Sequence, residues 1–151
     1  IVELCREQGI ELNVFIPPAH ATDNDAIRVT GQWEVFEEWK RKMVELVPVW
    51  DFSGYNSVVT EPIQDRMENY TDNSHFTTRV GNLILDRIFS KNAEAVPADF
   101  GVLLTPENVD SHLAQIERDR EVWAARNPEE VELVREIYEK FNAQQGKEKK
   151  S

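Results

Sequence analysis

The first eighteen residues constrain the fold more than any other part of the chain. Residues 1–8 mix apolar and charged side chains as the last turns of a helix do, and Gly9 follows where a left-handed cap is needed. Residues 11–16 (ELNVFI) then become increasingly apolar and stop at Pro17-Pro18, which indicates a buried strand. A helix, a glycine and a strand in this order form the returning half of an α/β unit. The segment therefore predicts a parallel sheet covered by helices.

The middle of the chain continues this alternation of strands and helices. We predict an amphipathic helix over residues 33–46, a second strand over 49–52 and a helix over 78–89 that is capped by Thr77. Gly81 lies inside the last of these helices. Because a helical glycine costs about 1 kcal/mol relative to alanine, we expect close packing at Gly81.

The predicted fold class is α/β, with a partial three-layer, parallel-sheet domain over residues 1–104. Two further helices begin at Pro106 and Pro128, since proline is favoured at the first helical position. These helices predict a helical hairpin extension over residues 105–143. Residues 144–151 are polar and rich in lysine, and we predict a disordered tail there.

The charge of the chain excludes several classes of partner. It has 28 acidic and 17 basic residues, with a net charge of −11. Nucleic acids and anionic membrane surfaces are bound by clustered lysine and arginine, so no nucleic acid partner is expected. The one cysteine, Cys5, permits neither an internal disulfide nor a cysteine-rich zinc site. No two histidines are spaced as in a helical metal site, and we expect no metal and no cofactor.

The strongest candidate for chemistry is Asp72 followed by His75, in a polar loop before the helix over 78–89. A carboxylate three residues before a histidine can turn back onto the ring, keep one nitrogen protonated and leave the other free to accept a proton. This is the orienting and base half of a nucleophilic triad. The same spacing also fits a capping aspartate beside a surface histidine, and both interpretations are open at this point.

His20 is a candidate substrate-binding residue. It follows the predicted strand that ends at Pro17-Pro18, and ligands of open α/β sheets bind beyond the carboxyl ends of strands. The alternative is an exposed loop histidine. His112 lies in a charged helical segment, and we predict no function for it.

Two runs, residues 49–56 (VWDFSGYN) and residues 71–89 (TDNSHFTTRVGNLILDRIF), together resemble the last block of the SGNH/GDSL hydrolase superfamily. In that family an aspartate and a histidine three residues apart follow the final strand and precede the C-terminal helix. The runs look like the bacterial, envelope-associated members, which include relatives of polysaccharide O-acetyltransferases. The resemblance covers about residues 1–89. It implies a flavodoxin-like SGNH domain and a location on the periplasmic side of the cell envelope.

The resemblance also implies an activity. Asp72 matches the aspartate of the family's triad and His75 matches its histidine, which would deprotonate a serine so that an acyl-enzyme forms. The acyl group would pass to water or to a sugar hydroxyl. The chain would thus belong to a serine-dependent acyl-ester hydrolase or O-acyltransferase, acting on a small acyl group of an acyl ester or an envelope saccharide.

The chain departs from the family pattern because it lacks the Gly-Asp-Ser nucleophile block and the oxyanion-hole residues. None of Ser53, Ser57, Ser74 and Ser90 lies in a nucleophile turn between a strand and a helix. We therefore expect the C-terminal half of a longer protein, inactive alone, whose N-terminal half is its partner and carries the serine. The alternative is a non-catalytic SGNH-like or partner-binding module that acts through its charged C-terminal helices.

Overall fold

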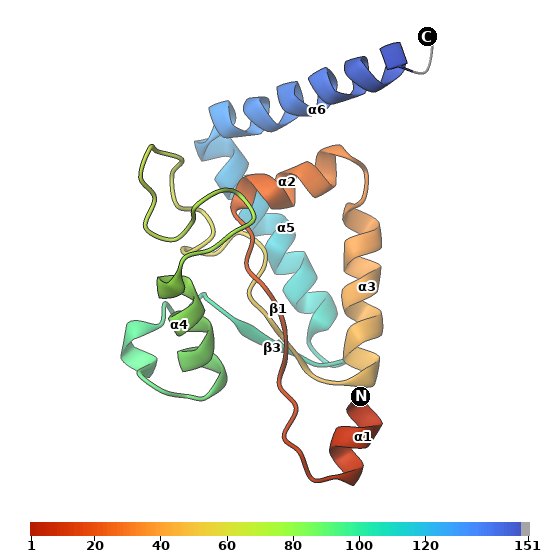
Figure 1. Cartoon of the computed structure of the whole chain (residues 1–151), viewed down its shortest axis with the longest axis vertical. Coiled ribbons are helices and arrows are strands. Elements are labelled where there is room, and N and C mark those ends of the chain that lie inside the picture. Colours follow the sequence, from red (N-terminus) through yellow and green to blue (C-terminus); the bar gives the residue numbers. More distant parts are fainter. Residues whose placement is uncertain (149–151) are drawn as a thin grey trace.

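Three short strands form a mixed sheet at the centre of the molecule. In the computed structural model, which describes residues 1–148, β1 (Val14–Ile16) pairs in parallel with β2 (Val49–Asp51). The third strand, β3 (Val102–Leu104), runs antiparallel to β2 on its other side, which gives the order β1–β2–β3. Figure 1 labels β1 and β3 among the surrounding helices. The predicted α/β class is confirmed. The sheet is not wholly parallel as predicted, because β3 returns in the opposite direction.

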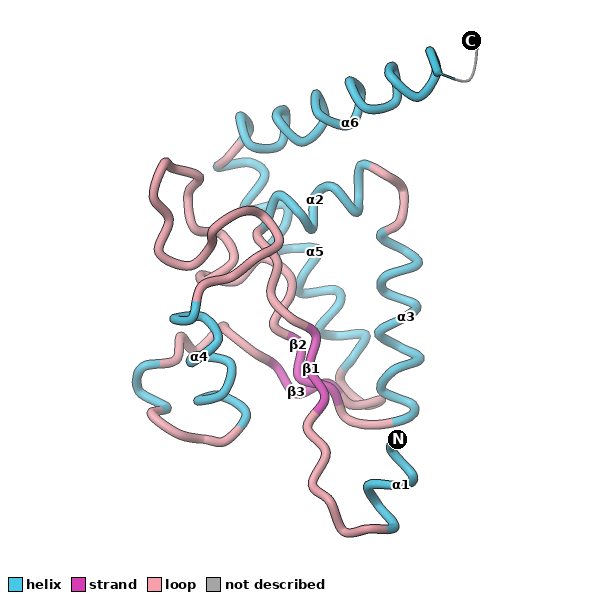
Figure 2. The backbone as a smooth tube through the Cα atoms, in the orientation of Figure 1, coloured by secondary structure: helices cyan, strands magenta, loops and turns pink. Residues whose placement is uncertain are grey.

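Helices surround these strands. They are α1 (Val2–Glu7), α2 (Ala21–Val29), α3 (Trp33–Leu46), α4 (Thr78–Ile88), the short 3-10 helix η1 (Ala93–Ala95), α5 (Val109–Arg126) and α6 (Pro128–Glu148). In Figure 2, α4 lies on one side of the strands, and α3 and α5 lie on the other. The arrangement therefore has a helix layer, a sheet layer and a second helix layer.

Local sequence signals explain several element boundaries. Gly9 follows α1 with a φ angle of +64°, a left-handed conformation that glycine adopts without steric cost. The helix predicted over residues 33–46 is α3, and Pro48 follows its end. The strand predicted over residues 49–52 is β2.

The larger core cluster joins α5 to the strands. Buried side chains of α3 and α5 pack there with Leu104 of β3, among them Trp33, Leu113, Ile116 and Trp123. These side chains include those of the first helix in the predicted hairpin extension over residues 105–143. This helix, α5, belongs to the main core because its apolar face is buried there.

Two ion pairs fasten α5 to α2 beside this core. The guanidinium of Arg28 lies 2.6 Å from a carboxylate oxygen of Glu117, and that of Arg120 lies 2.9 Å from Asp25. The Asp25 side chain is fully buried. Because a buried carboxylate needs a partner, the pair of Asp25 with Arg120 fixes where α5 lies on α2.

The smaller core cluster lies between the sheet and α4. It contains Val80, Leu83 and Ile84 from α4 together with Phe52 and Phe100. Phe52 directly follows β2, so this cluster holds α4 against the end of the central strand. The packing fixes the start of α4, and with it the loop that carries Asp72 and His75.

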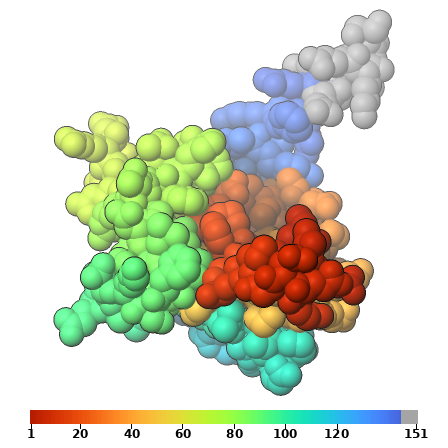
Figure 3. Space-filling view, turned by 60° about the horizontal axis from the view of Figure 1, so that its bottom comes forward, coloured from red at the N-terminus to blue at the C-terminus, as the bar shows by residue number. Residues whose placement is uncertain are grey.

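The last helix packs mainly on α2 and projects from the body of the molecule, as the blue segment in Figure 3 shows. It runs to Glu148, so residues 144–148 of the predicted disordered tail are helical, and residues 149–151 lie outside the described part of the chain. Although α6 is 21 residues long, neither it nor another helix of residues 1–148 is apolar enough to cross a membrane.

Candidate functional site

The candidate site lies in the long loop between β2 and α4. An isolated bridge pairs Tyr70 with Phe76 and closes the segment between them. Inside it, the backbone N–H of Thr71 donates to the carbonyl of His75 at 2.9 Å. These contacts turn residues 71–75 back on themselves. The turn brings the carboxylate at its start close to the imidazole at its end.

Asp72 contacts the imidazole of His75 through both carboxylate oxygens. Oδ2 lies 2.8 Å and Oδ1 lies 3.0 Å from Nδ1 of the ring. Oδ1 also accepts the backbone N–H groups of Ser74 and His75, each at 2.8 Å. The Ser74 N–H, the His75 ring and the His75 N–H lower the pKa of Asp72 to about 2. Asp72 is therefore an ionised and fixed partner for Nδ1.

The second ring nitrogen of His75, Nε2, has no hydrogen-bond partner among residues 1–148, and the side chain is 76% exposed. A carboxylate can only accept, so Nδ1 carries a proton towards Asp72 and Nε2 presents its lone pair in the neutral ring. The same carboxylate caps the turn through backbone N–H groups. Both interpretations left open by the sequence are thus present in one geometry.

No serine of the described chain lies against Nε2 of His75. The hydroxyl of Ser74 lies 3.2 Å from Nδ1, on the side of the ring that faces Asp72. None of the other serines between residues 1 and 148 hydrogen-bonds to His75: Ser53, Ser57, Ser90 and Ser111. The described residues therefore pair His75 with a carboxylate and place no serine hydroxyl at its Nε2.

His20 is buried, with 1% of its surface exposed. Its Nε2 lies 2.7 Å from the carbonyl oxygen of Glu61, to which it donates. Its Nδ1 therefore accepts, from the backbone N–H of Thr22 at 3.2 Å, and so caps α2. Both ring nitrogens are used inside the protein. The substrate-binding role of His20 stays a prediction, and in the described chain its ring joins the start of α2 to the loop after β2.

The loops after β1 and β2 converge, which the sequence left open. The backbone N–H of His20 donates to the carbonyl of Asn73 at 2.9 Å. The amide of Asn73 also reaches Asp23 at 3.4 Å. Burial, together with the nearby charge of Asp72, raises the pKa of Asp23. His20 thus holds the loop of the candidate base to the start of α2.

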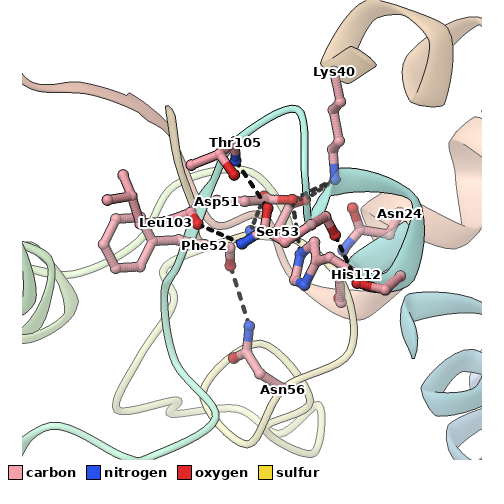
Figure 4. Close-up of polar contacts among 12 residues, drawn as sticks. Asn24, Lys40, Asp51, Phe52, Ser53, Asn56, Leu103, Thr105 and His112 are labelled. Atoms are coloured by element: carbon pink, nitrogen blue, oxygen red, sulfur yellow. Dashed lines mark hydrogen bonds and ion pairs between the residues drawn. The ribbon is translucent and has the colours of Figure 1, made fainter. Parts of the chain in front are cut away.

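A second polar cluster lies where β2 ends, and the sequence analysis missed it (Figure 4). Nζ of Lys40 lies 2.7 Å from Oδ2 of Asp51 and 2.7 Å from the hydroxyl of Ser53. The Lys40 and Asp51 side chains have no exposed surface. His112 of α5 places Nε2 3.1 Å from Oδ2 of Asp51. The cluster connects α3, β2 and α5.

The charges in this cluster stabilise one another. Burial alone raises the pKa of Asp51, but Lys40 and His112 outweigh it and hold the pKa well below its usual range. Ser53 adds hydrogen bonds to Asp51 from its backbone N–H at 2.9 Å and its hydroxyl at 2.7 Å. Such a set of partners joins three elements of the fold together.

Two sequence signals could have revealed this cluster. Lys40 lies on the apolar side of its helix, seven residues after Trp33 and four before Val44, both of which are buried. Asp51 interrupts an otherwise apolar strand. A charge at each of these positions predicts a buried partner, although it does not say which one.

No group of three or more histidine, cysteine, aspartate or glutamate residues within residues 1–148 is arranged to hold a metal ion. Comparison with known proteins finds no match for this chain among protein-family models, curated proteins or solved structures. Its function therefore has to be argued from the geometry of the site.

Proposed function

We propose that the chain is the base-bearing part of a serine-dependent acyl-ester hydrolase or O-acyltransferase. Asp72 is the orienting carboxylate and His75 the general base. The observation that carries the proposal is the contact of both Asp72 oxygens with Nδ1, at 2.8 and 3.0 Å, while Nε2 has no hydrogen-bond partner among residues 1–148 and the His75 side chain is exposed. A surface histidine needs no such partner, whereas a general base needs one ring nitrogen held and the other free.

The chemistry assigns each proton to an atom. Nε2 of His75 removes the proton of a serine hydroxyl as its oxygen attacks the ester carbonyl, and Asp72 stabilises the imidazolium that forms. The imidazolium returns the proton to the leaving alcohol, which leaves an acyl-serine. Nε2 then deprotonates water or a sugar hydroxyl, which attacks the acyl-serine. The imidazolium returns this proton to the departing serine oxygen, so the acid or acylated sugar is released and the serine hydroxyl is restored.

The serine is supplied by an N-terminal half of the same protein. The free edge of β1 gives such a partner a place to bind, because β1 pairs only with β2 within the described residues. Beside this edge lies an apolar groove of about 450 Å³ lined by Phe15, Phe76 and Leu85, among others. Phe15 is 43% and Leu85 is 52% exposed. A further strand along β1 would cover both.

The order of elements supports a relation to the SGNH hydrolases. A strand (β2), a loop with Asp72 and His75, and a helix packed on the sheet (α4) follow one another as in the family's last block. By the same relation we propose an acyl ester or an envelope saccharide as substrate and a location at the cell envelope. The strand β3 and the helices after it lie outside the resemblance.

Covalent labelling tests this proposal. The protein encoded by the whole open reading frame is treated with a fluorophosphonate, and the labelled serine is mapped by mass spectrometry. We expect one labelled serine, none of those at residues 1–148, and a loss of labelling in His75→Ala of about 100-fold or more. The control Asp65→Asn changes an exposed carboxylate of the same loop and keeps the labelling rate. Labelling that is unchanged in His75→Ala would overturn the proposal.

A further inference from the structure

A groove between α2 and α6 opens beside the loop that carries the proposed base. Its volume is about 500 Å³, within the range of small-molecule binding sites. One wall is the apolar stripe of α6, and the other is formed by α2 and the loop residue Ile63. Its apolar lining includes Ala26, Ile63, Leu133, Ile137 and Phe141.

The lining of this groove contains no charged residue, although the chain has 28 acidic and 17 basic residues. Its walls are formed largely by aliphatic and aromatic side chains. A phosphate or a bare sugar would lose its hydration there without compensating hydrogen bonds, whereas a hydrocarbon chain gains free energy with each methylene it buries. The groove thus selects an uncharged, apolar ligand.

Two polar lining residues connect the groove to the candidate site. Asn73 lines the groove and lies between Asp72 and His75 in the chain, and its carbonyl accepts the backbone N–H of His20 at 2.9 Å. Thr22 also lines the groove, and its hydroxyl lies 2.8 Å from Nδ1 of His20. A ligand in the groove therefore lies against the same hydrogen-bonded group that holds the His75 loop.

We propose that the groove between α2 and α6 binds the hydrocarbon tail of a medium-length acyl ester, whose ester group lies at Asn73 beside His75. The inference rests on the proposed function and names its substrate class. A chain of about ten carbons suits a site of this volume. The sequence resemblance implied a small acyl group, whereas the uncharged groove favours a longer one.

Binding of linear alcohols tests the groove without any catalysis. Hexanol, octanol and decanol are uncharged, so the net charge of −11 does not repel them. Titrations followed by NMR should show affinity rising about threefold to fourfold for each added methylene. The shifted amide signals should include those of Asn73 and Ile137.

Three variants locate the binding. Ile137→Glu adds a charge to the groove at a residue that is 58% exposed, and it should weaken decanol binding at least tenfold. Ala26→Leu narrows the groove without adding charge and should weaken decanol more than hexanol. The control Val35→Glu, at a 62% exposed position of α3 away from the groove, should leave binding unchanged. Circular dichroism confirms that each variant is folded.

The outcomes separate this inference from the proposed function. The groove assignment is overturned if the affinity for the alcohols does not depend on their chain length. It is also overturned if Ile137→Glu and Val35→Glu lose decanol affinity equally, even if the protein hydrolyses esters. Decanol binding in the groove without any ester hydrolysis would support the groove and count against the proposed function. The groove assignment and the proposed function are both supported if kcat/KM is higher for p-nitrophenyl decanoate than for p-nitrophenyl acetate and if Ile137→Glu abolishes this preference.

Discussion

Asp72 is the residue on which the site depends, because one carboxylate both caps a turn and orients an imidazole. Its oxygens accept two backbone N–H groups and contact Nδ1 of His75. The turn therefore cannot form in this geometry without also placing the ring. Positioning of this kind keeps a base aligned on an exposed loop, where packing alone would not hold it.

The protonation of Asp72 gives the first prediction. Its pKa is about 2, below the usual 3.9 of an aspartate, so its contacts are complete above about pH 4 and are lost as the pH falls towards 2. Carboxyl-carbon NMR should show this low midpoint, and His75→Ala should raise it by removing one hydrogen bond. A midpoint near 3.9 in the wild type would contradict the contacts described for Asp72.

Two glycines give a matched pair of predictions. A Cβ atom at Gly81 would lie 3.8 Å from the nearest side-chain atom, on Phe76, so the close packing expected there is absent. Gly81→Ala should therefore raise the free energy of unfolding by about 1 kcal/mol. At Gly101, where φ is +86°, a Cβ would overlap the ring of Phe52. Gly101→Ala should therefore lower the free energy of unfolding by more than about 1 kcal/mol. Urea unfolding measures both changes in the free energy of unfolding. Equal changes for Gly81→Ala and Gly101→Ala would contradict the packing described at these two glycines.

At the scale of elements, the contact of α3 with β2 depends on a buried charge. Lys40 and Asp51 are eleven residues apart, and their charged atoms lie 2.7 Å from each other without exposed surface. The desolvation of two charges is offset only while both are present. The pair thus fixes how α3 lies on the sheet, and Ser53 and His112 complete it.

Removing one charge of this pair gives the next prediction. Lys40→Met leaves Asp51 buried without its cation, and we expect a loss of about 3–5 kcal/mol in the free energy of unfolding. The double variant Lys40→Met with Asp51→Asn should recover part of this loss. The pKa of Asp51 is lower in the folded protein than in the unfolded chain, where it is 3.8. The stability that its charge supplies is therefore complete above that pH and is lost only well below it. Urea unfolding measures this loss. A free energy of unfolding of Lys40→Met within about 1 kcal/mol of the wild-type value would contradict the buried pair.

Elements set by local patterns were predictable from the sequence, and those set by distant contacts were not. The bounds of α3 follow from its apolar periodicity and Pro48, and the turn of Asp72 onto His75 follows from their spacing. The direction of β3 depends on the path of the preceding chain, which no local signal records. The pairing of His112 with Asp51 joins residues 61 positions apart and needed the fold.

At the scale of the whole molecule, the described chain has a three-stranded sheet in which β1 and β3 each pair only with β2. Helix α5 packs with Leu104 of β3, whereas the outer edge of β1 carries no further strand among residues 1–148. The loop between β2 and α4 and the helix α6 lie towards the same end of the strands (Figure 1). A partner on β1 would complete the sheet and leave that end accessible to a substrate.

The central claim is that Asp72 and His75 act together as an oriented base. The most direct test is the hydrolysis of p-nitrophenyl acetate by the protein encoded by the whole open reading frame, compared with His75→Ala, Asp72→Asn and the control Asp65→Asn. We predict that kcat falls about 10²–10⁴-fold in the first two variants and stays within twofold in the third. Unchanged kcat in His75→Ala would contradict the claim, and the chain would then be a non-catalytic module.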